Sequence, residues 1–351
     1  MSAPTIYLDH AATTPLLPQA ADAMARGFAI WANPSSPHRA GRAARAALED
    51  ARARIAAALD WPGEVILTAG ASEALAIALG RATVDRRIVS AVEHDAVLRA
   101  APDAAVLPMA GGEPDADALA AALAAPGRAV VAIQHTNSET GTMLLPLLRN
   151  ATIDRVHAAG GLVLCDASQL GPLRHIPDGV DLAVISGHKI GGPIGIGALL
   201  VRDFAMLAPS GGQERGYRQG TENLPGALGL AAALETGADL WATTVEQRQD
   251  FKNRLWRSCD VIAPGTQCAH IFALASPRHA ANALLIRLDA MGFAVSAGSA
   301  CSSGSLKPSR VLAGFAIDAG VARRTIRVSL GWSTTPDELD AFADAWQQIH
   351  A

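Results

Sequence analysis

Short apolar runs alternate with stretches of helical periodicity through the middle of the chain. The apolar runs are VILT (65–68), RIVSAV (87–92), AVVAIQ (129–134), GLVLCDAS (161–168), LAVIS (182–186) and GALLV (197–201). Continuous runs of Val, Ile and Leu that are separated by helices predict parallel strands buried on both faces. The expected fold class is therefore α/β.

Helical patterns surround these strands, and their character changes after Pro225. Before the first strand, Ala-rich and Arg/Glu-rich patterns predict helices over 18–30 and 43–59. After Pro225, one long helical pattern begins at 227 and continues in polar register through 240 to 256. A shorter β/α set follows, with expected strands at 270–276 and 325–331 and expected helices at 280–291, 310–313 and 336–349. This change predicts a large domain over 14–236 and a smaller α/β domain made of 1–13 and 237–351.

Composition and charge narrow the classes of partner. The 351 residues are half apolar and carry a formal charge of -4, so electrostatics do not favour nucleic acid or an anionic membrane. No basic-then-apolar leader opens the chain, and no uncharged apolar run approaches the roughly 18 residues that a spanning helix needs. We expect a cytoplasmic protein that binds a small molecule or another protein and contacts neither membranes nor nucleic acid directly.

The four cysteines must be judged singly. Cys165, Cys259, Cys268 and Cys301 form no CxxC pair and have no histidines at metal-ligand spacing, so we expect neither a structural zinc site nor a disulfide framework. Cys165 lies inside an apolar run and fits a small buried side chain. Cys259 and Cys268 lie in a segment to which the sequence assigns no role.

Polar residues follow several of the predicted strands. Lys189 is the most conspicuous, because it lies between an apolar run and a loop with glycines at 191, 192, 195 and 197. In open α/β sheets ligands gather beyond the carboxyl ends of the strands. The residues just past those ends are His94, Asn137, Ser138, Asp166, Gln169, Ser186, His188 and Lys189. Each alone fits an ordinary turn or core position, but their convergence on one edge predicts a ligand site.

A second signal lies after the first strand, where Ser72 falls at or near the start of a helix. A helix start with small residues offers N–H groups and a positive dipole end to an anion, although an ordinary Ser N-cap gives the same pattern. Together with Lys189 and with Asp166 one strand earlier, these groups are what pyridoxal phosphate requires. The amine can form a Schiff base, the carboxylate can keep the pyridine nitrogen protonated, and the helix can hold the phosphate.

Ten motifs in order resemble the cysteine desulfurases of the class V aminotransferase family, in the NifS/IscS-like group with a long catalytic loop. They are YLDHAATTP, NPSSPH, TAGASEA, EHDAVL, NSETG, DASQ, SGHKIGGPIGIGAL, GGQERGYRQGTEN, GSACSSGSLKPS and IRVSLG. This resemblance runs nearly end to end. It implies the pyridoxal-phosphate-dependent transferase fold type I, with a mostly parallel mixed sheet in the large domain, a smaller C-terminal α/β domain, pyridoxal 5'-phosphate as cofactor, no metal, and a homodimer.

The resemblance also implies roles around the cofactor. Lys189 should hold it covalently, His94 should stack on its ring, Asp166 should pair with the ring nitrogen and Gln169 should reach the ring hydroxyl. The residues expected to hold the phosphate are Ala71, Ser72, Ser186 and His188, with Thr221 from the other subunit of a dimer. Asn137 and Ser138 should lie near the cofactor, with Ser138 where the family commonly has a second asparagine.

For catalysis, the resemblance implies conversion of L-cysteine to L-alanine. Asn33 and Arg327 should clamp the substrate carboxylate, a task that suits arginine's planar fork. Lys189 should move the Cα proton, and the Cys301 thiolate should attack the substrate sulfur and form a persulfide. The small residues of GSACSSGS suit a loop that carries this sulfur to a protein acceptor. An iron–sulfur scaffold is the default acceptor, while tRNA or cofactor thiolation stay open.

Some departures and alternatives remain. Trp332 stands where many relatives carry arginine, and the segment 257–275 is shorter than usual. One alternative is a selenocysteine lyase or another class V aminotransferase that works without Cys301, and another is an inactive scaffold partner in sulfur transfer. A nucleotide-binding loop at GHKIGGPIGIG is disfavoured, because a Walker-type loop needs its glycines before the lysine and a helix after it.

Overall fold

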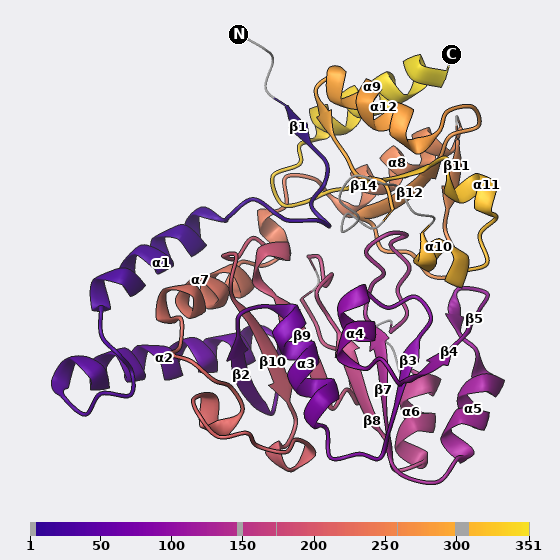
Figure 1. Ribbon diagram of the computed structural model, residues 1–351. Helices are drawn as coiled ribbons and strands as arrows, with labels where there is room; N and C mark the ends of the chain where they lie inside the picture. Colours follow the sequence, from indigo (N-terminus) through magenta and orange to yellow (C-terminus); the bar gives the residue numbers. More distant parts are fainter. Residues whose placement is uncertain (1–4, 146–149, 173, 258, 299–308, 351) are drawn as a thin grey trace.

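The computed structural model describes residues 5–145, 150–172, 174–257, 259–298 and 309–350 (Figure 1). Its centre is a seven-stranded sheet in the order β2-β10-β9-β8-β7-β3-β4. In chain order these strands are β2 (Glu64–Thr68), β3 (Arg86–Ser90), β4 (Ala105–Leu107), β7 (Ala129–Gln134), β8 (Leu162–Asp166), β9 (Leu182–Ser186) and β10 (Gly197–Val201). The expected strands are confirmed, and β4 is an addition that its sequence did not signal.

Strand direction corrects one expectation. Strands β3, β4, β7, β8 and β9 are mutually parallel, but β10 is antiparallel to both of its neighbours, whereas the sequence pattern predicted a parallel strand there. The reason is the connection: only 187–196 separate β9 from β10, and a parallel crossover needs a dozen or more residues. The sheet is therefore mixed and mostly parallel.

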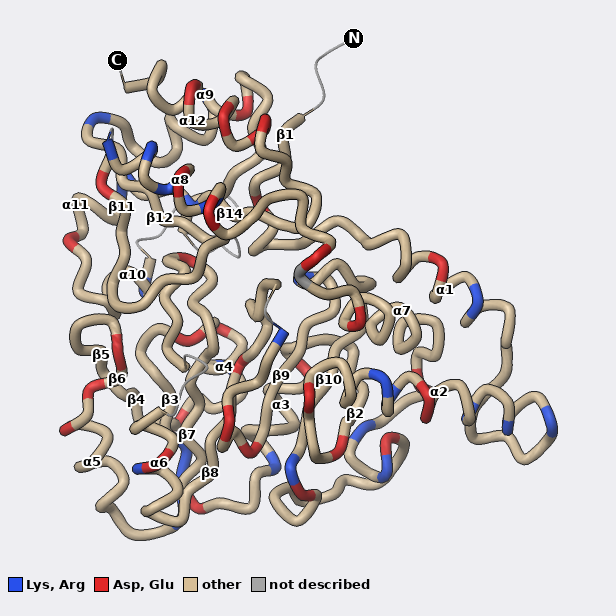
Figure 2. Tube along the Cα trace, turned by 180° about the vertical axis from the view of Figure 1, so that it is seen from behind, with Lys and Arg blue, Asp and Glu red and all other residues tan. Residues whose placement is uncertain are grey.

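Helices cover both faces of this sheet, because alternate side chains of each strand point to opposite faces. Val163 and Cys165 of β8 belong to one apolar cluster, and Leu162 and Leu164 belong to the other. The helices of this part are α1 (Pro18–Ile30), α2 (Arg39–Ala58), α3 (Ala71–Arg81), α4 (Asp95–Ala100), α5 (Ala116–Ala124), α6 (Ala151–Ala158) and α7 (Leu224–Glu235), with short 3-10 turns η1 (Gly187–Lys189), η2 (Phe204–Met206) and η3 (Glu214–Gly216). Charged residues lie mostly on helices and loops, and β7, β9 and β10 carry none (Figure 2).

A second, smaller sheet holds the C-terminal part of the chain. It is antiparallel, in the order β11 (Asp260–Ile262), β12 (Ile271–Ala275) and β14 (Thr325–Ser329). Its other elements are η4 (Ala238–Leu240), α8 (Val245–Trp256), α9 (Ala281–Ala290), α10 (Arg310–Gly314), α11 (Ala319–Ala322) and α12 (Pro336–His350). A core that includes Phe251, Phe272, Phe342 and Trp346 fills the space between this sheet and its helices.

The N-terminal segment packs against this C-terminal part of the chain. Strand β1 (Ile6–Tyr7) pairs in parallel with β13 (Phe293–Ala294), so both chain ends lie at the same end of the molecule (Figure 1). A small hairpin of β5 (Met109–Ala110) and β6 (Glu113–Pro114) completes the described strands. The division into a large domain over 14–236 and a small domain of 1–13 and 237–351 stays a prediction.

The long helix expected from 227 to 256 is wrong, because the chain breaks it. Helix α7 ends at Glu235, and α8 starts after Thr244, whose hydroxyl accepts from the Gln247 N–H while the Gln247 side chain accepts from the Thr244 N–H. This capping box is a start signal that the sequence displays. Among the described helices, none has the length and apolar character needed to cross a membrane.

Candidate active site

A cavity of about 680 Å³ opens at the edge where β3, β7, β8 and β9 end, between the large sheet and β14. Strand β2 runs in the same direction as β9, so the start of α3 reaches this edge too. The predicted site residues that line the cavity are Ala71, Ser72, His94, Ser138, Asp166, Gln169, Ser186, His188, Lys189 and Arg327. The structure thus brings together side chains from five strand ends and from the second sheet.

Lys189 is held at this edge by its backbone. It closes the turn η1 directly after β9, and Thr14 binds this turn twice, with its N–H on the His188 carbonyl at 2.8 Å and its hydroxyl on the Lys189 carbonyl at 3.2 Å. The backbone of the turn packs closely against the residue before β10, since a Cβ on Gly187 would lie 2.8 Å from the Ile196 carbonyl oxygen. Glycine is therefore needed for the close backbone approach that presents the lysine.

Asp166 ends β8 and is buried on another wall of the cavity. Its Oδ1 accepts hydrogen bonds from the Ser168 N–H at 3.0 Å and from the Ser168 hydroxyl at 2.6 Å. These two donors fix the carboxylate group, because a buried charge must be hydrogen-bonded. The Asp166 carboxyl group is thus held in place on the same cavity that Lys189 lines.

His94 caps α4, and its Nδ1 accepts from the Ala96 N–H at 3.2 Å. Burial lowers the pKa of His94, and the positive charge of Lys189 lowers it further. The imidazole is therefore neutral at neutral pH. Since Nδ1 is an acceptor, its proton lies on Nε2.

The start of α3 is suited to an anion. No side chain caps its first turn, and the residue before it is Gly70 with φ of 150°. The N–H groups around Ala71 and Ser72 thus face the cavity with the positive end of the helix dipole. Glu73 adds a carboxylate to the same turn, and that carboxylate accepts from the Ala69 N–H and pairs with Arg218 at 3.3 Å.

Two of the predicted amides are engaged within the protein. Asn137 does not line the cavity, because its Oδ1 accepts from the Glu139 and Thr140 N–H groups and its Nδ2 donates to the Val92 carbonyl. Gln169 does line the cavity, and its Nε2 donates to the Ala11 carbonyl at 2.8 Å. Asn137 thus shapes the turn that presents Ser138, and its contact with a cofactor stays a prediction.

Arg327 is nearly buried in β14 and bridges the two sheets. Its Nη2 pairs with Asp9 at 2.7 Å, its Nη1 donates to the Ser138 carbonyl at 3.0 Å, and its Nε has no partner among the described residues. Asp9 also accepts from the Ser296 hydroxyl at 2.7 Å. The guanidinium is therefore fixed at the cavity wall, and its Nε is left without a partner in the described chain.

Glu93, which sequence reasoning missed, is fully buried at the cavity wall. Its Oε1 accepts from the Ser90 hydroxyl at 2.6 Å and from the Gln134 N–H at 2.9 Å, while Oε2 has no partner in the described part of the chain. Burial, with a smaller contribution from Asp166, raises the pKa of Glu93 to about 8. Its place directly before His94 was the available sequence signal.

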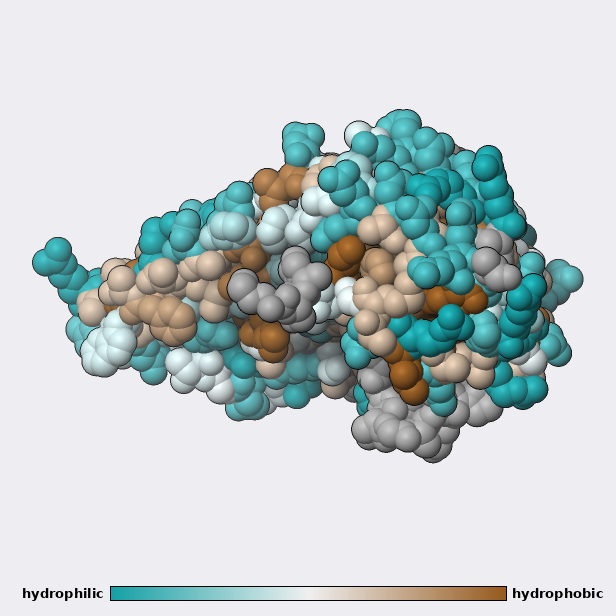
Figure 3. All heavy atoms as spheres, turned by 90° about the horizontal axis from the view of Figure 1, so that it is seen from above, coloured by the Kyte–Doolittle hydropathy of each residue, from teal (hydrophilic) through white to brown (hydrophobic). Residues whose placement is uncertain are grey.

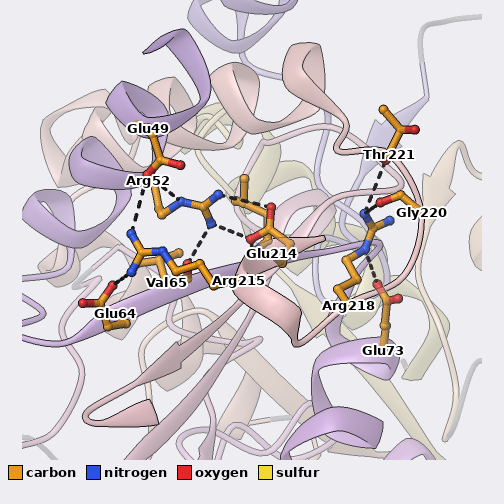
Figure 4. A network of polar contacts seen from close by, with 11 residues as sticks. Glu49, Arg52, Glu64, Val65, Glu73, Glu214, Arg215, Arg218, Gly220 and Thr221 are labelled. Atoms are coloured by element: carbon orange, nitrogen blue, oxygen red, sulfur yellow. Dashed lines mark hydrogen bonds and ion pairs between the residues drawn. The ribbon is translucent and has the colours of Figure 1, made fainter. Parts of the chain in front are cut away.

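Besides Asn137, two further predicted residues lie outside the cavity. Asn33 and Thr221 are exposed on loops that touch each other, since the Ser35 hydroxyl donates to the Gln213 side chain at 3.1 Å. In Figure 4 the Arg218 side chain holds the second loop, donating to the carbonyls of Gly220 and Thr221. Neither Asn33 nor Thr221 faces the cavity of its own chain.

Cys301 falls outside the described residues, so its predicted role is not tested here by geometry. Arg310, soon after it in sequence, lines the cavity. The three described cysteines, Cys165, Cys259 and Cys268, are buried free thiols away from the cavity, and burial raises the pKa of each, to about 12 for Cys259 and about 11 for Cys268. Among the described residues, no cluster of His, Cys, Asp or Glu could hold a metal ion.

Known proteins are similar to this chain over nearly its whole length. The sequence profile of the class V aminotransferases matches residues 6–342. The IscS-like cysteine desulfurase of Mycobacterium tuberculosis is 35% identical, over 95% of this chain and 93% of that protein. The structure of a NifS-like protein from Rickettsia africae superposes with a TM-score of 0.85 at 26% identity, covering 98% of this chain and 99% of that one. A protein named SspA, solved in complex with cysteine, has a TM-score of 0.78 at 29% identity and covers 93% of this chain and 99% of that one.

Proposed function

Since the chain belongs to the class V aminotransferase family, we propose that it is a pyridoxal-phosphate-dependent cysteine desulfurase. It converts L-cysteine to L-alanine and passes the sulfur through Cys301 to a protein acceptor. The observation that carries this proposal is the convergence of Lys189, Asp166 and the start of α3 on one cavity. The names of the relatives and the cysteine complex of SspA support the substrate.

The cavity fits the cofactor. Its volume of about 680 Å³ lies within the usual range for cofactor sites and leaves room for a small amino acid. The N–H groups at Ala71 and Ser72 suit the phosphate, Asp166 suits the ring nitrogen, His94 offers a ring to stack on, and Lys189 supplies the amine. When bound, pyridoxal phosphate supplies an electron sink that stabilises negative charge at the substrate Cα.

Side chains of the protein carry out the proton transfer, bind the substrate carboxylate and accept the sulfur. The Lys189 amine is the base that takes the Cα proton, and the neutral His94 can donate from Nε2. Arg327, fixed by Asp9 and by the Ser138 carbonyl, offers its guanidinium group to the substrate carboxylate. The Cys301 thiolate then attacks the substrate sulfur, so that the S–Cβ bond breaks, its electron pair stays with the carbon skeleton, and a proton on Cβ completes alanine. The sulfur remains on Cys301 as a persulfide, and the acceptor is a partner protein such as an iron–sulfur scaffold.

A homodimer completes this proposal. Thr221 and Asn33 are exposed outside their own cavity, so they serve the phosphate and carboxylate only if they reach into a partner's cavity. Large apolar side chains are exposed on the same side, with Phe28 and Trp31 at the end of α1 and Ile194 at the cavity rim. Figure 3 shows the arm of helices at this side with many tan, apolar residues. Exposed apolar surface of this kind is typical of an interface.

The decisive experiment replaces Cys301 by Ala and measures alanine and sulfide formed from L-cysteine under reducing conditions. Both should fall to background, while the purified variant keeps its visible cofactor absorbance. Cys268→Ala is the matched control, because its thiol is buried away from the cavity, and it should keep full activity.

Other outcomes separate the alternatives. Undiminished turnover in Cys301→Ala, with selenocysteine preferred to cysteine, would replace the proposal by a selenocysteine lyase, and amino transfer to an oxoacid would indicate a transaminase. A colourless protein that takes up no pyridoxal phosphate would instead leave only a scaffold role.

A further inference from the structure

A second, much smaller cavity lies behind Lys189, and we propose that it binds a single halide-sized anion with Arg174 as its counter-charge. The cavity has a volume of about 30 Å³ and lies where the loop before β9 meets β12 and the turn after β14. The side chains that matter for this site are His10, Arg174, Lys189, Trp241, His270 and Trp332. The site is a second cavity beside the substrate cavity, and Ala11, Gln169 and Lys189 line both.

Arg174 provides the charge. It is only 9% exposed, its Nη2 reaches the Ile190 carbonyl at 3.4 Å, and its Nε and Nη1 have no partner among the described residues. Burial lowers the pKa of Arg174 to about 10, so the guanidinium stays charged at neutral pH. No carboxylate pairs with it in the described chain, and the residues outside that part contain no Asp or Glu.

The other walls add two buried histidines. His270 and His10 are 8% and 3% exposed, and their Nε2 and Nδ1 atoms have no partner in the described structure. Burial lowers the pKa of His270 to about 3 and of His10 to about 4, so both rings are neutral and each carries one N–H. The charged groups that act on these two rings include Arg248, which stacks on Trp241, and Asp9, whose charge is paired with Arg327.

These features favour an anion over a water molecule. A charge without a partner in the interior is strongly unfavourable, and arginine cannot relieve it by losing its proton. Water would satisfy a hydrogen bond but would leave the charge, whereas chloride neutralises it. The cavity of about 30 Å³ has room for a small occupant such as a monatomic anion.

The walls cannot adjust easily to another occupant. A Cβ on Gly171 would lie 2.4 Å from the His270 ring, and a Cβ on Gly331 would lie 1.9 Å from the His10 ring, so both rings pack directly against glycine backbone. Because Arg174 also donates to the carbonyl of Ile190, next to Lys189, a bound anion would brace the backbone from which the lysine projects.

The first test measures thermal unfolding of the full-length protein against chloride, with sodium gluconate keeping the ionic strength constant so that screening does not change. Above its dissociation constant, each tenfold increase in chloride should raise Tm by about 2 °C for 351 residues. Arg174→Met should abolish this response and, in gluconate alone, should melt no lower than the parent protein. Arg202→Met, at an exposed arginine that also donates only to a carbonyl, should keep the response.

The second test needs no variant. Crystals of the protein grown in millimolar bromide should give an anomalous difference peak within hydrogen-bonding distance of Arg174 and His270. Three results would overturn the proposal: a Tm independent of chloride, an Arg174→Met variant destabilised equally in both media, or bromide at this position only at molar concentration, which indicates an adventitious ion only.

Discussion

Arg52 and Arg174 are both buried, but the fold surrounds them differently. Arg52 pairs with Glu214 through two nitrogens, at 2.5 and 3.2 Å, and donates to the Val65 carbonyl at 2.8 Å (Figure 4). Arg174 has one carbonyl and no carboxylate. The charge of Arg52 is therefore paired by a carboxylate of the same chain, whereas the charge of Arg174 remains available to a ligand. A buried charge indicates a binding site only when the chain does not supply its partner.

Glu93 is a third buried ionisable residue, and it avoids an unpaired charge in another way. It is as buried as Arg52 and Arg174, and Arg310 lowers its pKa only in part, so burial keeps the carboxyl protonated to about pH 8. A carboxyl group can give up its charge in this way, whereas a guanidinium cannot. Only the buried arginine therefore requires a counter-ion.

The largest expected effect comes from removing one partner of the buried Arg52–Glu214 ion pair. Glu214→Ala should leave the buried Arg52 guanidinium without its two-point partner, with only the half-exposed Glu49 at 3.3 Å from its Nε, and should lower the free energy of unfolding by about 3–5 kcal/mol. Urea denaturation measures it. The control is Glu235→Ala, which breaks the exposed pair with Arg54 and should cost less than about 1 kcal/mol. Equal losses in the two variants would contradict the comparison.

Arg327 is intermediate between Arg52 and Arg174. It is paired with Asp9, but its Nε has no partner among the described residues. Arg327→Met should lower kcat/KM for L-cysteine by roughly 10- to 100-fold, mainly through KM, because a hydrogen bond to a charged group contributes about 1.5–3 kcal/mol. Steady-state kinetics check this. Arg324→Met serves as the control, because Arg324 donates to the Gly320 and Ser276 carbonyls away from the cavity. A matching loss there would show that the effect is structural.

Glu93 gives the pH dependence. Its pKa is about 8 in the folded protein and lower when unfolded, so the folded state holds the extra proton between these values. Its stabilisation is therefore complete below pH ~4.5 and is lost as the pH rises toward 8, with a slope of at most about 1.4 kcal/mol per pH unit. Urea denaturation at pH 6, 7 and 8 should show this slope, and Glu93→Gln should flatten it. An unchanged slope in the variant would assign the dependence to other groups.

The smallest effect concerns a partly exposed pair at the start of α3. Arg218 neutralises Glu73 in the turn proposed to hold the phosphate. Arg218→Met should weaken binding of pyridoxal phosphate to the apoprotein by about fivefold, or roughly 1 kcal/mol, and adding Glu73→Gln should restore it. Absorbance titration of the apoprotein measures both. Losses that add in the double variant would mean that the two charges act independently.

Local pattern and the family motifs together predicted most strands and the residues that line the cavity. They could not predict partners that are distant in sequence, such as Asp9 for Arg327 or Glu214 for Arg52, because each partner alone resembles an ordinary surface charge. Asn33 and Thr221 show the complementary limit, since motifs identified them and the fold of one chain places them outside its own cavity. The direction of β10 was open to prediction from the short loop before it, and that signal was overlooked.

The pairing of the two chain ends has a consequence for how the protein is made. The first residues have their partners near the end of the chain: Ile6 pairs with Phe293, Ala11 donates to Ser329, and Asp9 pairs with Arg327, 318 residues later. At roughly 5–20 residues per second of translation, these N-terminal residues wait about 15–60 s for their partners to leave the ribosome. The substrate cavity is thus completed only after β14 has been synthesised, and a product that stops before β14 cannot assemble it.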